Sequence, residues 1–304
     1  MMKTSNVLMA AFLLFSLSAL SCTTPPPDNQ KTIVATYSAL GSIVKDLVGD
    51  RANVVVSTPN GLDPHEFAPS ARDIEAINKA DLVVQNGLGL EGGLLRALHS
   101  AQSRGVRFFT ATDHIEVRRV GPGEGVSAGD PDQAPGAPDP HFWTDPVSMK
   151  SVVAALAPVL KQELGLDVDT RAADVESRLD ALNKQIAGIV ATLPPSERKL
   201  VTGHESMGYF AQRYGFRLVG VIVPSLSSQA QTSAADLAAL KQAIKANQVK
   251  AVFGELETSP AVARTIADET GVKVVQLTTH GLPSDGSYFT FMTNLATTVV
   301  DALK

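Results

Sequence analysis

Short runs of β-branched and other apolar residues alternate with amphipathic stretches along most of the chain. In the first half these runs predict strands at 33–38, 52–58, 81–87 and 106–112, with helices near 39–48, 70–80 and 91–102. The strand candidates are nearly continuous apolar runs, which is typical of parallel strands covered on both faces.

The second half repeats the same plan. Strands are predicted at 199–203, 217–223, 250–256 and 272–278, and helices near 206–215, 233–247, 260–270 and 288–303. We therefore expect an α/β fold of two lobes, each with a mostly parallel four-stranded sheet.

A long amphipathic stretch at 170–193 lies between the two halves and ends at a Pro-Pro pair. As a helix it would be roughly 35 Å long. One interpretation is an ordinary packing helix; we favour a rigid helix that joins the lobes. The expected division is then an N-terminal lobe at 31–166, a linking helix at 167–195 and a C-terminal lobe at 196–304.

The N-terminus has the pattern of a secretory signal. Lys3 precedes an apolar run at 7–20, and Cys22 follows it. Cys22 is the only cysteine, so no intramolecular disulfide can form. The sequence "ALSC" resembles the lipobox of bacterial lipoproteins, although an incidental thiol is the alternative. We expect a signal peptide at 1–21, lipidation of Cys22, a proline-rich tether at 22–30, and a periplasmic or cell-surface protein anchored to the membrane.

Two features narrow the class of protein. The formal net charge of −5 gives no basic surface for nucleic acid. The segment 113–140 is rich in glycine, proline and acids, and predicts a long mobile loop.

The positions of the histidines are the main chemical signal. Four of the six follow the carboxyl end of a predicted strand, two in each lobe: His65, His141, His204 and His280. Ligands bind at that edge of open α/β sheets, so a cleft between the lobes would gather all four around a metal. A lone histidine is more often structural, and we expect His99 and His114 not to be ligands.

The tripeptide Asp-Pro-His occurs twice, with its histidines at His65 and His141. Proline restricts its own backbone and that of the preceding residue, so each histidine would be held still. Asp63 and Asp139, or nearby carbonyl groups, would accept a hydrogen bond from the far ring nitrogen. Trp143 would help to exclude water. The alternative is a pair of ordinary turns.

At these residues the sequence resembles the metal-binding solute-binding proteins of bacterial ABC importers. The similar segments are "DPHEFAPSARDIEAINKADLVVQNGLGLEG", "DPHFWTDP", "LVTGHESMGYFAQRYGF" and "GSYFTFMTNLATTVVDAL". The resemblance implies metal ligands at His65, His141 and His204, and a supporting role for Glu255. In "LTTHGL", His280 stands where the family usually has an acid, so His280, Asp285 or a water remain alternatives for the fourth ligand.

The resemblance implies a monomeric binding protein, not an enzyme, that delivers a divalent metal to a membrane permease; some relatives carry an adhesin label. Four imidazoles favour Zn²⁺ over Mn²⁺, although copper and nickel would also bind tightly. A manganese- or iron-binding member of the family is the alternative. A secreted zinc hydrolase is a weaker one, because "HESMG" lacks the second histidine of a His-Glu-x-x-His motif.

Overall fold

The computed structural model describes residues 30–121, 124, 135–256 and 258–304. The signal peptide predicted at 1–21, Cys22 and all but the last residue of the tether lie outside these residues. Within them no helix combines the length and the apolar character that crossing a membrane requires.

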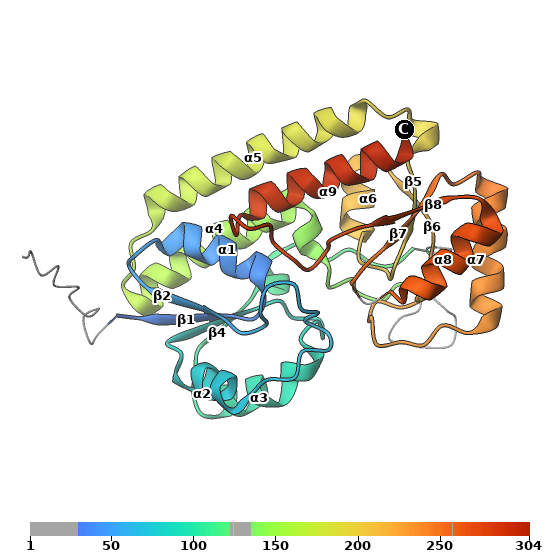
Figure 1. Ribbon diagram of the computed structural model, residues 1–304. Coiled ribbons are helices and arrows are strands. Elements are labelled where there is room, and N and C mark those ends of the chain that lie inside the picture. Colours follow the sequence, from blue (N-terminus) through green and yellow to red (C-terminus); the bar gives the residue numbers. More distant parts are fainter. Residues whose placement is uncertain (1–29, 122–123, 125–134, 257) are drawn as a thin grey trace, which may run out of the picture. The chain divides into compact units, whose positions relative to one another are not determined.

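The N-terminal part contains a four-stranded parallel sheet in the order β2-β1-β3-β4 (Figure 1). Its strands are β1 (Thr32–Ala35), β2 (Asn53–Val56), β3 (Leu82–Gln85) and β4 (Phe108–Thr110). Successive side chains of a strand point to opposite faces. Ile33 accordingly packs toward α1 (Ser38–Val48) and α4 (Pro146–Leu164), and Val34 toward α2 (Ala71–Lys79) and α3 (Leu95–Ser103). Both faces are therefore covered, as the apolar runs predicted.

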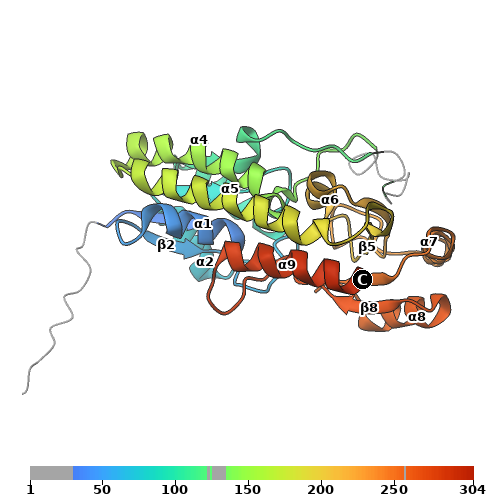
Figure 2. The same ribbon diagram turned by 90° about the horizontal axis from the view of Figure 1, so that it is seen from above.

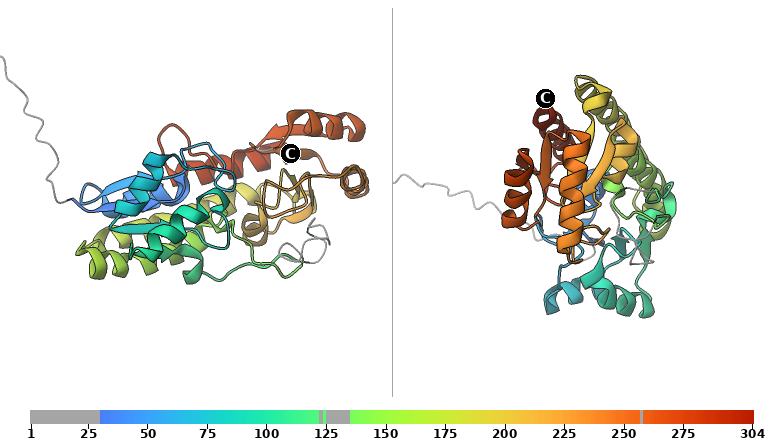
Figure 3. Two further views of the ribbon diagram at one scale, coloured as in Figure 1. Left: turned by 90° about the horizontal axis from the view of Figure 1, so that it is seen from below. Right: turned by 90° about the vertical axis from the view of Figure 1, so that its right-hand side faces the viewer.

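The C-terminal part has four strands at the predicted places: β5 (Lys199–Thr202), β6 (Arg217–Val221), β7 (Ala251–Gly254) and β8 (Lys273–Gln276). They hydrogen-bond as two parallel pairs, β5-β6 and β7-β8, so the expected single four-stranded sheet is wrong in this detail. Strands β5 and β7 are neighbours. Just beyond the end of β5, the backbone N–H of Gly203 donates a hydrogen bond to the carboxylate of Glu255. Helices α7 (Ala234–Asn247) and α8 (Pro260–Thr270) cover one face (Figure 3).

The predicted long helix is α5 (Asp169–Ala191), and it does not stand alone. It packs against α4 on one side and α9 (Tyr288–Leu303) on the other (Figure 2). Although α9 falls in the predicted C-terminal lobe, its first residue donates its backbone N–H to Ser42 of α1. The connection between the two parts is thus a layer of helices, and the lobe boundaries stay predictions.

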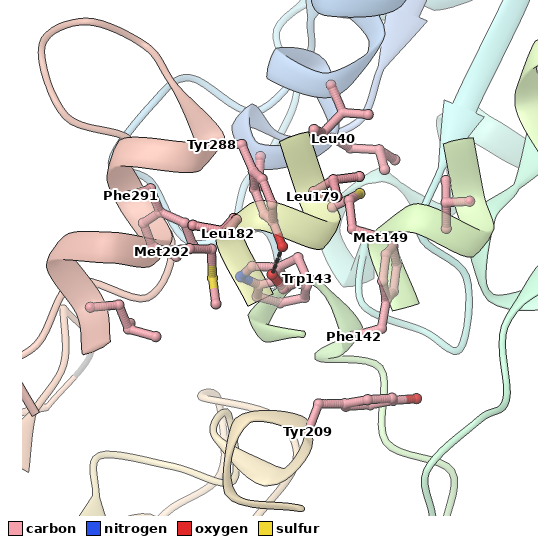
Figure 4. Close-up of a cluster of buried hydrophobic side chains, with 14 of the residues drawn as sticks. Leu40, Phe142, Trp143, Met149, Leu179, Leu182, Tyr209, Tyr288, Phe291 and Met292 are labelled. Atoms are coloured by element: carbon pink, nitrogen blue, oxygen red, sulfur yellow. Dashed lines mark hydrogen bonds between the residues drawn. The ribbon is translucent and has the colours of Figure 1, made fainter. Parts of the chain in front are cut away.

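A core of aromatic and aliphatic side chains lies where these helices meet (Figure 4). Trp143 and Tyr288 are fully buried there, and the Tyr288 hydroxyl donates to the Trp143 carbonyl over 2.7 Å. Asp145 caps α4 through the N–H of Val147, and Pro146 is the first helical residue. This start of α4 fixes the segment that carries His141.

Candidate metal centre

Four histidines far apart in the sequence come together in the structure. Each of His65, His141, His204 and His280 offers one ring nitrogen, and these four atoms all lie within 4.8 Å of one another. Their exposed fractions are between 0% and 7%. Each follows a strand or precedes a helix at the carboxyl edge of the sheets, which is why the strand order brings them together.

The spacing of the nitrogens matches the dimensions of a tetrahedral metal site. The Nε2 atom of His141 lies 3.2 Å from Nε2 of His65 and 3.2 Å from Nε2 of His204. Four nitrogens at about 2.0–2.1 Å from a zinc ion are roughly 3.3–3.4 Å apart. These two separations are therefore close to those that a zinc ion requires.

His141 is oriented by a buried carboxylate. Its Nδ1 donates to Asp139 over 2.9 Å, and its backbone N–H donates to the same oxygen. The other oxygen of Asp139 accepts from Arg118 over 3.0 Å. The proton of the ring is thus committed to Nδ1, and Nε2 carries a lone pair toward the other histidines.

Glu255 has the same role for the two histidines of the C-terminal part. Its Oε2 lies 3.0 Å from Nδ1 of His204 and accepts from the Thr279 hydroxyl over 3.0 Å. The oxygen of Thr279 in turn lies 3.2 Å from Nδ1 of His280. Because the hydroxyl proton goes to Glu255, this oxygen accepts from His280. Both rings therefore present Nε2 without a proton.

Asp63, the aspartate of the first Asp-Pro-His repeat, does not accept the expected hydrogen bond from the ring of its histidine. Asp63 accepts the backbone N–H of His65 over 2.9 Å and the hydroxyl of Ser228, but it does not contact the ring. The carbonyl of His65 accepts from Gln229 over 2.8 Å. The backbone of His65 is therefore fixed by the opposite lobe, while among the described residues no acceptor contacts its Nδ1.

An aromatic side chain packs against one side of the cluster. The Trp143 ring lies 5.3 Å from that of His141 and 5.5 Å from that of His280, between centroids. Its Nε1 donates to the Thr279 carbonyl over 2.9 Å, so one side chain joins segments 136 residues apart. Trp143 thus ties the two halves of the site together, and its role in limiting water stays a prediction.

Burial sets the charge of the cluster. Desolvation, followed by the neighbouring rings, lowers the pKa of His65 and His141 well below the usual value. Burial would raise the pKa of Glu255, but His204 and several hydrogen bonds lower it to about 2. The pKa of Asp139 rises to about 6, because burial outweighs the charge of Arg118. Neutral imidazoles backed by an ionised carboxylate are the form that binds a metal.

The remaining candidates lie outside the cluster. Asp285 is exposed and accepts from the Ser287 N–H and the Thr290 hydroxyl at the start of α9, so its carboxylate is engaged away from the cluster. His99 is exposed, and His114 stacks on Phe109 with ring centroids 4.6 Å apart. The prediction that neither histidine joins the site agrees with these positions.

The ends of the predicted loop at 113–140 are held in place. Arg119 and Pro138 form an antiparallel bridge, and Tyr209 accepts the backbone N–H of Arg118 over 2.9 Å. Residues 122–123 and 125–134 lie outside the described part.

Several residues that support the site were not predicted from the sequence: Arg118, Thr279, Ser228 and Gln229. Their only local signal was their place beside a candidate histidine or in a polar loop. Glu205, next to His204, was also missed. It is buried with its pKa raised by desolvation and by Asp139.

Known proteins share this sequence pattern and this fold. Residues 33–302 match the model of the family described as "Zinc-uptake complex component A periplasmic". The manganese-binding lipoprotein MntA of Halalkalibacterium halodurans is 27% identical over 280 residues, covering 90% of this chain and 88% of that protein. The zinc-binding lipoprotein AdcA of Streptococcus pneumoniae is 29% identical over 279 residues, and the chain spans only 54% of its length.

A solved structure shows the same arrangement. The periplasmic zinc-binding protein TroA of Treponema pallidum superimposes with a TM-score of 0.77 at 25% identity, covering 90% of this chain and 99% of that one. The α/β fold with parallel sheets is thereby confirmed.

Proposed function

Because this chain belongs to the periplasmic zinc-uptake component A family, we propose that it captures Zn²⁺ with His65, His141, His204 and His280 and delivers it to a membrane permease. Members of this family are metal-binding substrate-binding proteins of ABC transporters and not enzymes. The zinc-hydrolase alternative is therefore rejected. The metal is the cargo of the protein.

The choice of zinc rests on one observation, the four imidazoles without a carboxylate among the converging groups. Imidazole is a borderline ligand that suits Zn²⁺, whereas Mn²⁺ favours sites that contain carboxylate oxygens. The names of relatives do not decide between the metals, since one is named for zinc and another for manganese. The nitrogen spacing of 3.2 Å also supports a small tetrahedral ion.

The hydrogen bonds of the site favour a cation at its centre. With the protons of His141 and His204 on Nδ1, beside Asp139 and Glu255, two lone pairs would face each other across 3.2 Å. Two such atoms repel one another unless a positive charge lies between them. Asp139 and Glu255 would supply negative charge behind a bound ion.

We further propose that Cys22 carries a lipid after cleavage of residues 1–21, and that the protein works as an extracytoplasmic monomer held near its permease. The mention of lipoproteins in the names of relatives supports this anchor.

Competition between metals tests the proposed function. Protein stripped of metal should bind Zn²⁺ much more tightly than Mn²⁺ in a titration against a zinc indicator. Replacing His280 with aspartate puts a hard oxygen at that position and should reduce the difference between the affinities for Zn²⁺ and Mn²⁺. The matched control is His99→Asp, which places the same charge on the surface. A wild-type preference for Mn²⁺ would overturn the proposal.

A further inference from the structure

One cavity reaches the histidine cluster from solvent. It has a volume of about 720 Å³, and its walls include His65, Leu88, Gly89, Pro138, Leu226 and Ser227. The exposed fraction of Leu88 is 41%, and Pro135 and Gly136 at the rim are also exposed. The cavity is therefore open outward and ends at His65.

His65 is the only one of the four histidines that lines this cavity. The other three are backed on the far side of their rings: His141 by Asp139, His204 by Glu255 and His280 by Thr279. His280 has a slightly larger exposed fraction, 7% against 4%, but it does not line this opening. Its ring is also held by the chain of hydrogen bonds that ends on Glu255.

The ring of His65 is also the least constrained of the four. Its backbone is fixed by Asp63 and Gln229, but among the described residues nothing accepts from its Nδ1. A ligand with no outer hydrogen bond is oriented only by packing, so its ring turns away from a metal more easily than a ring held by a carboxylate. The ring without an outer hydrogen bond is thus the one that lines this cavity.

We propose that the metal enters and leaves through this cavity, and that His65 is the first ligand it meets and the last it releases to the exterior. This inference rests on the proposed function. The lining suits the passage of a cation, since none of its described residues is a lysine or arginine and its prolines have no N–H to repel one.

Blocking the cavity tests the route. Leu88→Cys is introduced with Cys22→Ser, so that the new thiol is the only one in the full chain. The thiol is capped either with a methylthio group or with a bulky aromatic disulfide. Leu95→Cys, at a leucine with a similar exposed fraction of 40% outside the cavity, receives the same two caps.

Zinc association and chelator-induced release are then followed by stopped flow. The bulky cap at position 88 should slow both rates about tenfold relative to the methylthio cap, because it raises the barrier without changing either end state. The dissociation constant should stay within about twofold, and position 95 should show no difference. Equal rates for the two caps at position 88 would overturn the route. If the capped protein does not fold, Ser227→Cys on the opposite wall gives the same comparison.

The order of the ligands is tested by comparing His65→Ala with His280→Ala. Each variant loses one imidazole, so both should release zinc faster. Only His65→Ala should also slow association, by about tenfold, because the first contact is missing. An equal loss of association rate in His280→Ala would overturn the role of His65. A different result would contradict the proposed function itself: His141→Ala and His204→Ala binding zinc as tightly as the parent.

Discussion

Asp139 and Glu255 perform the same chemical task on opposite sides of the site. Each accepts a hydrogen bond from Nδ1–H of a histidine and so directs the lone pair of Nε2 inward. They differ in their surroundings. Asp139 has a single cationic partner, Arg118, whereas Glu255 accepts from backbone and side-chain donors on two segments, residues 203–206 and Thr279.

Replacing Asp139 with asparagine should weaken zinc binding about 10–100-fold. The amide keeps the size of the side chain but removes the charge that stabilises a metal-bound His141, and it leaves Arg118 without its buried partner. Asp285→Asn is the control, since Asp285 accepts from the Thr290 hydroxyl on the surface, away from the histidines. Competition titration measures both. If the two variants bind equally well, Asp139 has no part in holding the ligand.

The lowered pKa values of His65 and His141 determine how the metal-free protein responds to acid. Below about pH 6.5 the histidines of the unfolded chain bind protons, whereas the buried rings of the folded protein stay neutral. The unfolded state then binds more protons, so the free energy of unfolding falls as pH drops. The metal-free protein should be less stable at pH 5 than at pH 7, and zinc affinity should fall in the same range. Urea unfolding at several pH values measures this, and a pH-independent midpoint would contradict it.

The histidines were predictable because each follows a strand, and strand ends in an α/β sheet share one edge. The partners of those histidines were not. Asp63 and Ser228 are 165 residues apart, and no local pattern relates them. Asp63 and Asp139 occupy equivalent places in two repeats, yet only Asp139 reaches a ring, because Asp63 is drawn toward the hydroxyl of Ser228.

At the level of elements, hydrophobic periodicity placed the strands and the α-helices other than α4 near their observed positions, but it did not determine which strands pair. Just beyond β5, the backbone N–H of Gly203 donates to the carboxylate of Glu255, a contact between residues 52 apart that no local pattern predicts. Periodicity also identified the buried face of α5 without showing that α9 lies beside it. Pairing and packing partners are long-range properties that one segment does not encode.

The layer formed by α4, α5 and α9 should account for much of the stability. Leu182 of α5 is buried in the shared core, and Leu182→Ala should lower the free energy of unfolding by about 2–5 kcal/mol. Gln185→Ala, on the exposed side of the same helix, should change it by less than about 0.5 kcal/mol. Denaturant unfolding measures both. Similar effects of the two substitutions would mean that α5 does not contribute to the core in this way.

On the scale of the whole described part, from residue 30 onward, the two halves are joined by direct hydrogen bonds as well as by helices. Trp143 donates to the carbonyl of Thr279, Ser38 donates to the carbonyl of His280, and Ser228 donates to Asp63. These bonds lie around the histidine cluster itself. Together with the helix layer they favour small adjustments on metal binding over a wide hinge movement.

Small-angle scattering of metal-free and zinc-loaded protein measures the size of this change. The radius of gyration should be the same in both states within experimental error, because the helix layer resists bending and only local ring movements are required. Protein treated with chelator and then reloaded with zinc is the control for aggregation. A marked decrease on loading would show that the lobes close like a hinge.

We propose that the four imidazoles alone hold the zinc ion. Anomalous scattering from crystals of the zinc-loaded protein, measured at the zinc absorption edge, tests this proposal. We expect one anomalous peak at about 2.0–2.1 Å from Nε2 of each of the four histidines, with tetrahedral geometry. A peak that lacks His280 and is completed by water or Asp285, or a peak elsewhere in the molecule, would contradict it.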